Sequence, residues 1–164
     1  MLTHLRSLLV PVLFLVPMTT VMAADPYADH TGQSDFETLL EGAEAAILER
    51  SLYINDRMPM NTMLERTGKD LGMNEKLYLH AQSIEFCSTV LACKMASEDP
   101  RRIVNCPFIL TVYVLPGEPD KTHVAYRKIP AQEVASSAAM AEVAAMLRAV
   151  AEAAIAWIRT PWCV

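Results

Sequence analysis

The segment between Phe108 and Ile129 constrains the fold most strongly, because its pattern is typical of a β-hairpin. Residues 108–115 and 122–129 are rich in the β-branched and aromatic side chains that strands favour. The turn-forming cluster Pro-Gly-Glu-Pro-Asp at 116–120 separates them. Two strands joined by so short a connection pair in antiparallel fashion. The chain is therefore expected to contain an antiparallel sheet.

Helical periodicity and helix-start motifs indicate that helices accompany this sheet. Ser34 with Glu37, and Thr62 with Glu65, match the capping box, in which both side chains bond to free amides of a first helical turn. Apolar residues recur every three or four positions after each start, and again near the C-terminal end. The predicted helices cover residues 34–50, 62–72, 88–98 and 137–158.

Two further stretches, 52–56 and 76–86, have the character of extended strands. In the second, the apolar positions change parity between Ala81 and Ile84, which we interpret as a β-bulge near residues 82–83. Strands and helices do not alternate regularly along the chain, and this argues against a parallel sheet. We therefore expect a small two-layer α+β domain, with a mostly antiparallel sheet and helices packed on one face.

The first 23 residues have the three parts of a secretory signal peptide. Arg6 supplies the positive charge, residues 8–18 are apolar or proline, and Ala23 ends a small-residue cleavage site. A membrane anchor would need roughly 20 apolar residues, about twice this run. We expect cleavage after Ala23, export to a bacterial periplasm, and no membrane span after signal removal. The remainder is interpreted as a polar N-terminal tail (24–33) followed by one α+β domain (34–164).

The charge of the chain argues against one class of partner. Its formal net charge is −5, and loss of Arg6 with the signal peptide makes the remainder more acidic. The basic residues are scattered, with Arg101 and Arg102 the only adjacent arginines. Nucleic-acid binding requires a basic face, so we do not expect a nucleic-acid partner.

A series of short motifs runs through the chain in a characteristic order. Glu-Phe-Cys-Ser at 85–88 and Cys-Pro-Phe at 106–108 are the most specific of them. The accompanying stretches are 63–72, 77–81, 95–100, 103–105, 112–113 and 126–127. In this order the motifs resemble the exported branch of DUF302, a family of domains of unknown function, from Ser34 to the final helix.

The resemblance implies a small α+β fold that often associates into dimers, while the family name assigns no activity. This sequence departs from the family pattern in two places. Cys93 and Cys163 lie outside the pattern, which leaves their pairing open. The polar residues 25–33 stand where the family has an extended segment before the first helix, which removes the signal for one edge strand.

All four cysteines follow the signal peptide, and an even number in an oxidising compartment favours disulfides. None lies in a Cys-x-x-Cys motif. Because Cys87 and Cys106 match the family motifs, the resemblance implies a structural disulfide between them. The alternatives are free thiols, or a working redox pair in which Cys87 is a reactive thiolate at a helix N-terminus. Cys93 and Cys163 are candidates for a second bridge.

Three methionines, Met58, Met60 and Met63, form a Met-x-Met-x-x-Met run, and thioether ligands suit Cu(I). The competing interpretation is that they fill an irregular part of the core, as methionine often does. We favour the core, because no histidine lies nearby in the sequence to complete a copper site. The histidines elsewhere have no spacing typical of a metal site either.

No catalytic residue or cofactor is identified from the sequence. Ser88 has no neighbouring His-Asp pattern, and Glu85 is interpreted as a rim residue. We therefore predict a non-enzymatic accessory module of the cell envelope that binds a small apolar ligand, a haem-like cofactor or a protein partner. The predicted groove is lined by Met60, Phe86, Tyr113 and Tyr126. The alternatives are a thiol-redox or copper-handling protein, using the Cys87–Cys106 pair and the methionine run, and a structural homodimer.

Overall fold

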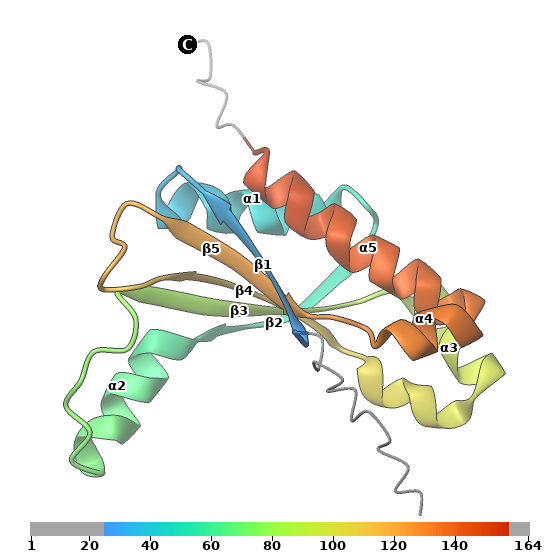
Figure 1. The fold of residues 1–164 in the computed structure, drawn as a ribbon, viewed down its shortest axis with the longest axis horizontal. Coiled ribbons are helices and arrows are strands. Elements are labelled where there is room, and N and C mark those ends of the chain that lie inside the picture. Colours follow the sequence, from blue (N-terminus) through green and yellow to red (C-terminus); the bar gives the residue numbers. More distant parts are fainter. Residues whose placement is uncertain (1–24, 158–164) are drawn as a thin grey trace, which may run out of the picture.

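The computed structural model describes residues 25–157, which form a five-stranded sheet with helices packed against it (Figure 1). The expected α+β class is confirmed. The elements are β1 (Tyr27–Gly32), α1 (Phe36–Leu48), β2 (Tyr53–Pro59), α2 (Met60–Asp70), β3 (His80–Cys87), α3 (Thr89–Glu98), the 3₁₀ helix η1 (Pro100–Asn105), β4 (Phe108–Val114), β5 (Thr122–Arg127), α4 (Ala131–Ser136) and α5 (Ala138–Ile155). The predicted signal peptide lies outside the described residues.

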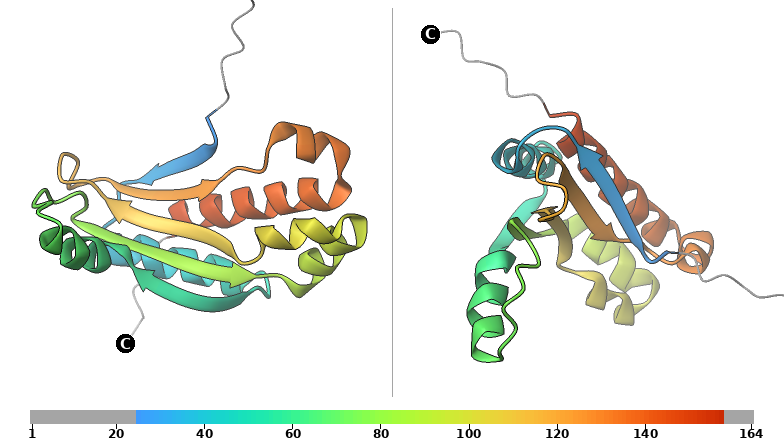
Figure 2. Two further views of the ribbon diagram at one scale, coloured as in Figure 1. Left: turned by 90° about the horizontal axis from the view of Figure 1, so that it is seen from below. Right: turned by 60° about the vertical axis from the view of Figure 1, so that its left-hand side comes forward.

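The sheet is antiparallel throughout, with the strand order β1-β5-β4-β3-β2 (Figure 2). The predicted hairpin is confirmed, because residues 110–114 of β4 pair with residues 122–126 of β5. In the turn between them the Glu118 amide donates to the Leu115 carbonyl at 3.1 Å. Within the described part of the chain, no helix is both long enough and apolar enough to cross a membrane.

The expectation of an irregular polar tail is wrong for residues 27–32, which form strand β1. This strand pairs with β5 along its whole length, from Tyr27 opposite Arg127 to Gly32 opposite Thr122. An edge strand has a neighbour on one side only and tolerates polar residues better than a central strand. Its hydropathy therefore gave no strand signal. The folded domain includes β1 and does not start at residue 34.

Helices α1 and α5 cover one face of the sheet (Figures 1 and 2). Their apolar stripes enclose the core with the inward side chains of the strands. The largest fully buried side chains are Leu39, Ile47, Ile84, Phe86, Met95, Leu110, Val112, Thr122, Val124, Met140, Val143 and Val150. The predicted start of α1 is wrong by one residue. Asp35, and not Ser34, caps the helix, and its carboxylate accepts from the Thr38 amide at 2.9 Å.

The start and end of α3 agree with the sequence prediction. Ser88 caps the helix, and its hydroxyl accepts from the Leu91 amide at 3.3 Å. The helix ends at Glu98, and Pro100 occupies the first turn of η1. Proline has no amide hydrogen and fits this position without losing a bond. The long C-terminal helix is also confirmed, and Ser137 caps it through the Met140 amide.

The bulge predicted near residues 82–83 is not there. Strand β3 pairs with β4 without interruption, and the register shift lies in β2, between Ile54 and Asp56. The shift of the apolar positions along β3 has another cause. Ile84 faces α1 and α5, whereas Ala81 is buried on the opposite face, at the end of β3 that α2 contacts. Both faces of β3 are therefore partly covered.

Helix α2 departs from the two-layer plan. It lies on the side of the sheet opposite α1 and α5 (Figure 1), and none of its residues is buried. It begins at Met60, directly after β2, and no side chain caps it, so the capping box predicted at Thr62 is wrong. Its chain reverses at Gly72, whose φ of +74° favours glycine.

Candidate functional site

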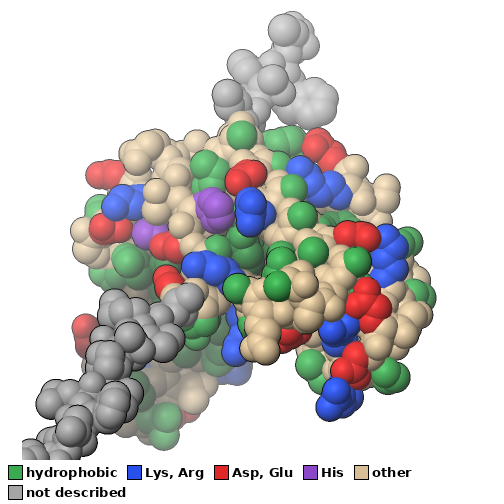
Figure 3. All heavy atoms as spheres, turned by 45° about the vertical axis from the view of Figure 1, so that its right-hand side comes forward, with side chains coloured by type: hydrophobic (Ala, Val, Ile, Leu, Met, Phe, Trp, Pro, Cys, Tyr) green, Lys and Arg blue, Asp and Glu red, His purple; other side chains and the backbone are tan. Residues whose placement is uncertain are grey.

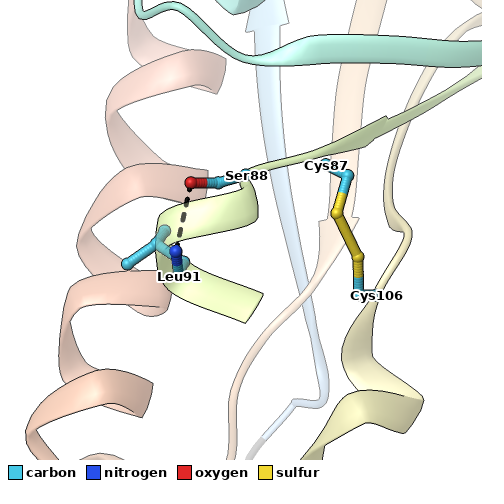
Figure 4. The surroundings of a disulfide bond; sticks show 4 residues. All are labelled: Cys87, Ser88, Leu91 and Cys106. Carbon is cyan, nitrogen blue, oxygen red and sulfur yellow. Dashed lines mark hydrogen bonds between the residues drawn. A yellow bond between two sulfur atoms is a disulfide. The ribbon is translucent and has the colours of Figure 1, made fainter. Parts of the chain in front are cut away.

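The structure places Cys87 and Cys106 in a disulfide, with Cα atoms 6.2 Å apart (Figure 4). Cys87 ends β3 and Cys106 lies between η1 and β4, so the bond joins two neighbouring strands near their ends. This confirms the pairing that the family resemblance implied. Cys93 is exposed on α3 and forms no disulfide with another described residue, and Cys163 lies outside the described residues. A second bridge and redox activity both stay predictions.

The four side chains of the predicted groove do not come together. Phe86 is fully buried in the core, and Tyr126 faces the same layer from β5. Tyr113 points to the opposite face of the sheet, where its ring meets Tyr78 and His123. Met60 is half-buried at the start of α2. The sequence could not separate the two faces because the register between strands was unknown.

The three methionines of the Met-x-Met-x-x-Met run do not form one site either. Met58 is 40% exposed on β2, opposite Ser83, and Met63 contributes to a hollow of about 730 Å³ between α2 and the segment that follows it. Among residues 25–157 no group of three or more His, Cys, Asp or Glu side chains is placed to hold a metal ion. The copper hypothesis, which rests on thioether ligands, stays a prediction.

The sheet face that points away from α1 and α5 is called the open face here, and it carries a cluster of polar groups. His123 is only 6% exposed, and its Nδ1 lies 2.9 Å from Asp29 Oδ2. Its Nε2 lies 3.2 Å from Glu118 Oε2. Tyr113 stacks on the imidazole with ring centroids 4.6 Å apart. Burial, and then the Asp29 carboxylate, raise the pKa of Tyr113 to about 12.

The cluster around His123 connects three segments of the chain. Asp29 belongs to β1, Glu118 to the hairpin turn and His123 to β5, so the imidazole joins three segments. Both ring nitrogens already have carboxylate partners, and the ring is covered by Tyr113. A general base or a metal ligand needs a nitrogen that can reach its substrate or ion. The geometry therefore favours a structural role for His123.

A different site lies where the edge of the sheet meets α4 and α5. It is a hollow of about 660 Å³, a volume in the range of small-molecule sites, roughly 300–1,000 Å³. We call it the α4–α5 crevice. It is lined by Ala28, His30, Tyr126, Lys128, Ile129, Ala131, Val134, Ala135, Ala144, Arg148 and Glu152. In the space-filling view, histidine and basic (lysine or arginine) side chains lie near hydrophobic side chains on this face of the molecule (Figure 3).

The periodicity of each element explains this lining. Ala144, Arg148 and Glu152 are four residues apart and share one face of α5. Val134 and Ala135 come from one face of the short helix α4, and alternate residues of β1 supply Ala28 and His30. The apolar side chains that these elements contribute are small. They therefore leave part of the space between the helices and the strand edge unfilled.

The polar groups of the crevice gather around Tyr126. Burial raises the pKa of this tyrosine, and the neighbouring Arg148 guanidinium acts in the opposite direction. The His30 ring lies nearly parallel to the tyrosine ring, with centroids 6.0 Å apart. Lys128 and Arg148 form no ion pair among the described residues. An apolar hollow with a few converging polar groups is the usual form of a ligand site.

Of these residues the sequence analysis identified Tyr126 alone. His30 was missed because β1 was taken for an irregular tail. Arg148 and Glu152 lie off the apolar stripe of the last helix, and this alone does not indicate a ligand site. Their spacing of four residues beside Ala144 was the available signal, but it gains meaning only once β1 is known to lie alongside α5.

A second hollow, of about 640 Å³, lies on the open face beside the crevice. Tyr27, Ile109 and Arg127 contribute to it, and it shares Tyr126, Lys128 and Ile129 with the crevice. The end of β5 and the residues that follow it thus separate two hollows. We take the crevice as the candidate site because His30 and Arg148 both approach the buried Tyr126 there, beside the small side chains of α4 and α5.

Comparison with known proteins supports the fold. No family model matches the sequence, and no curated protein matches it. A solved structure does match: an uncharacterized conserved DUF302 protein from Bacillus stearothermophilus, with a TM-score of 0.64 and 15% sequence identity. The alignment covers 80% of this chain and 99% of that one. The chain has a DUF302-like fold. The resemblance inferred from the motifs is confirmed at this level, and membership of the exported branch stays a prediction.

Proposed function

We propose that this DUF302-like protein is an exported, non-enzymatic binding module that holds a small, largely apolar ligand in the α4–α5 crevice. One observation carries the proposal. Small apolar side chains of α4, α5 and β1 wall a hollow of about 660 Å³ that is also lined by a tyrosine, a histidine and two cations with no ion-pair partner among residues 25–157. A site of this kind selects a ligand by shape and by a few polar contacts.

Two features support the placement outside the cytoplasm. The first 23 residues have the pattern of a secretory signal peptide. A disulfide between Cys87 and Cys106 supports this placement, since disulfides persist in oxidising compartments and cytosolic reductants keep most thiols reduced. Intact-mass measurement of the protein purified from the periplasm tests both, because it gives the cleavage site and the loss of two hydrogens per disulfide.

Filling the crevice tests the binding site. Ala144 lines the crevice on α5, whereas its neighbour Ala145 is exposed and does not. We expect the uncharged fluorophore N-phenyl-1-naphthylamine to bind the unaltered protein and Ala145→Trp alike, and to lose most of its affinity for Ala144→Trp. Fluorescence titration measures all three affinities. Circular dichroism of both variants shows whether the fold is kept.

Equal affinities of the two tryptophan variants would contradict the proposal. The hollow beside α2 offers a second apolar surface, lined in part by Leu64 and Leu77. Binding that survives Ala144→Trp but is lost in Leu64→Glu would place the ligand there. In that case the crevice would have no part in binding.

A further inference from the structure

We infer that the ligand of the α4–α5 crevice is a monoanionic amphiphile: a short apolar chain that ends in a single carboxylate. The inference rests on the proposed binding function and adds the chemical class of the ligand. The carboxylate lies between Lys128 and Arg148, beside the Tyr126 hydroxyl. The apolar chain lies along the small side chains of α4 and β1.

The charges of the lining carry this assignment. Lys128 and Arg148 are both exposed, and neither has an ion-pair partner among residues 25–157. Elsewhere on the described surface most arginines and lysines do have such partners, as in the pairs Arg57–Glu44 at 2.5 Å and Lys94–Glu142 at 2.6 Å. The crevice therefore keeps two cations unpaired next to an apolar wall. Such an arrangement attracts an anion and repels a cation.

The same lining indicates how much negative charge the ligand carries. Glu152 lies on the same face of α5 as Arg148 and offsets one of the two positive charges. Lys128, Arg148 and Glu152 together give the lining one excess positive charge. A single carboxylate balances this charge, whereas a dianionic phosphate would bring a second negative charge close to Glu152. The planar guanidinium of Arg148 suits the two oxygens of a carboxylate.

Tyrosine and histidine complete the polar end of the site. Tyr126 is 9% exposed, and its pKa is raised by burial, so the hydroxyl keeps its proton and can donate to an anion. The His30 ring lies beside it on β1. The apolar part of the lining consists of alanines together with Ile129 and Val134, its largest side chains. One hollow thus combines polar groups with an apolar wall, as an amphiphile requires.

Calorimetric titration with three ligands of equal chain length tests the inference. The probes are octanoate, 1-octanol and octylammonium, each below the concentration at which it aggregates. We expect octanoate to bind about tenfold more tightly than octanol, since a hydrogen bond to a charged group contributes roughly 1.5–3 kcal/mol. Octylammonium is expected to bind more weakly than octanol. In Lys128→Gln/Arg148→Gln the preference of octanoate over octanol is expected to disappear.

The control is Arg66→Gln/Lys69→Gln, which removes the same charges from α2, away from the crevice. It is expected to keep the preference. Equal binding of octanoate and octanol to the unaltered protein would overturn the anionic ligand and leave the proposed binding function standing. A preference that survives Lys128→Gln/Arg148→Gln overturns it as well. If none of the three probes binds, the binding function and the ligand class both fail.

Discussion

Single side chains join the layers of this molecule at two places. At the first, the Glu98 carboxylate at the end of α3 accepts from the Ser137 hydroxyl and from the Ala139 amide, the latter at 3.1 Å, and pairs with Arg102. Ser137 and Ala139 lie at the start of α5. Glu98 therefore fastens α3 to the N-terminus of the helix that covers the core, where the helix dipole also favours a negative charge.

This contact makes stability depend on pH. The hydrogen bonds from Ser137 and Ala139, followed by Arg102, lower the pKa of Glu98 below its usual value of 4.5. A carboxyl whose pKa is lower in the folded state stabilises the fold above its unfolded pKa, and loses this effect as the pH falls through the folded pKa. Glu98→Gln is therefore expected to be less stable than the unaltered protein at pH 7.

The stability difference should shrink as the pH falls below 4.5 and through the lowered pKa of Glu98, because the carboxyl then loses its charge and resembles the glutamine amide. Urea unfolding at several pH values measures it. Glu142→Gln is the control, since Glu142 pairs with Lys94 in an exposed contact for which little stabilisation is expected. If Glu98→Gln lowers the free energy of unfolding by the same amount at pH 7 and at pH 3, the explanation is wrong.

The second place is the cluster around His123, which joins β1, the hairpin turn and β5. His123→Phe keeps a ring against Tyr113 but removes both contacts to carboxylates. We expect a loss of about 1–3 kcal/mol in the free energy of unfolding, the usual range for buried polar groups that lose partners. Hydrogen exchange should accelerate most at the amides of β1.

His80→Phe is the matched control, because His80 is exposed and stacks on Phe36 without a carboxylate contact in the structure. It is expected to change exchange in β1 little. Unchanged exchange in β1 of His123→Phe would show that the strand is held by backbone pairing and packing alone.

At the scale of elements, the parts that the sequence predicted are those whose signal is local. The β4–β5 hairpin has a turn cluster between two apolar runs, and α5 has a long apolar stripe. Strand β1 has neither a turn cluster nor an apolar stripe. It can be recognised only from its pairing with β5 and its contact with α5. In β3 the buried positions do shift from one face to the other between Ala81 and Ile84. The reason is that α2 packs against the face that carries Ala81, and not that the strand contains a bulge. The candidate site escaped prediction because it lies between β1 and α5.

The packing of α1 on the end of α5 depends on a position without a side chain. A Cβ added to Gly42 would lie 2.5 Å from the Trp157 Cβ and 3.0 Å from the Ala154 carbonyl oxygen. Gly42→Ala should therefore push α1 away from the end of α5. Alanine raises helix propensity by up to about 1 kcal/mol, but overpacking costs roughly 1–3 kcal/mol. The net expectation is lower stability.

Thermal unfolding followed by circular dichroism measures this change. Gly117→Ala is the control, because a Cβ there would meet no atom within 4 Å. Equal or higher stability of Gly42→Ala would show that α1 and the end of α5 can move apart without cost.

At the scale of the whole molecule, two parts of the structure differ in how they are held. The sheet with α1 and α5 forms the core, and the disulfide adds a covalent link at its β3–β4 end. Helix α2 and the segment after it contribute no side chain to this core, and Leu71 and Met73 are largely exposed. The α4–α5 crevice lies at the β1 edge, at the opposite end of the strand order from α2. Stability and ligand binding can therefore be altered separately.

Replacing the disulfide tests this separation. Cys87→Ser/Cys106→Ser opens a loop of 19 residues, and the chain-entropy estimate for such a loop is about 3 kcal/mol. We expect the melting temperature to fall, while the affinity of the crevice for N-phenyl-1-naphthylamine at 20 °C stays unchanged. Cys93→Ser, which removes an exposed cysteine that forms no disulfide within residues 25–157, controls for the loss of a sulfur and should change neither quantity. If the double variant keeps its stability but loses a cellular function that Cys93→Ser retains, the bond has a redox role and the structural interpretation is wrong.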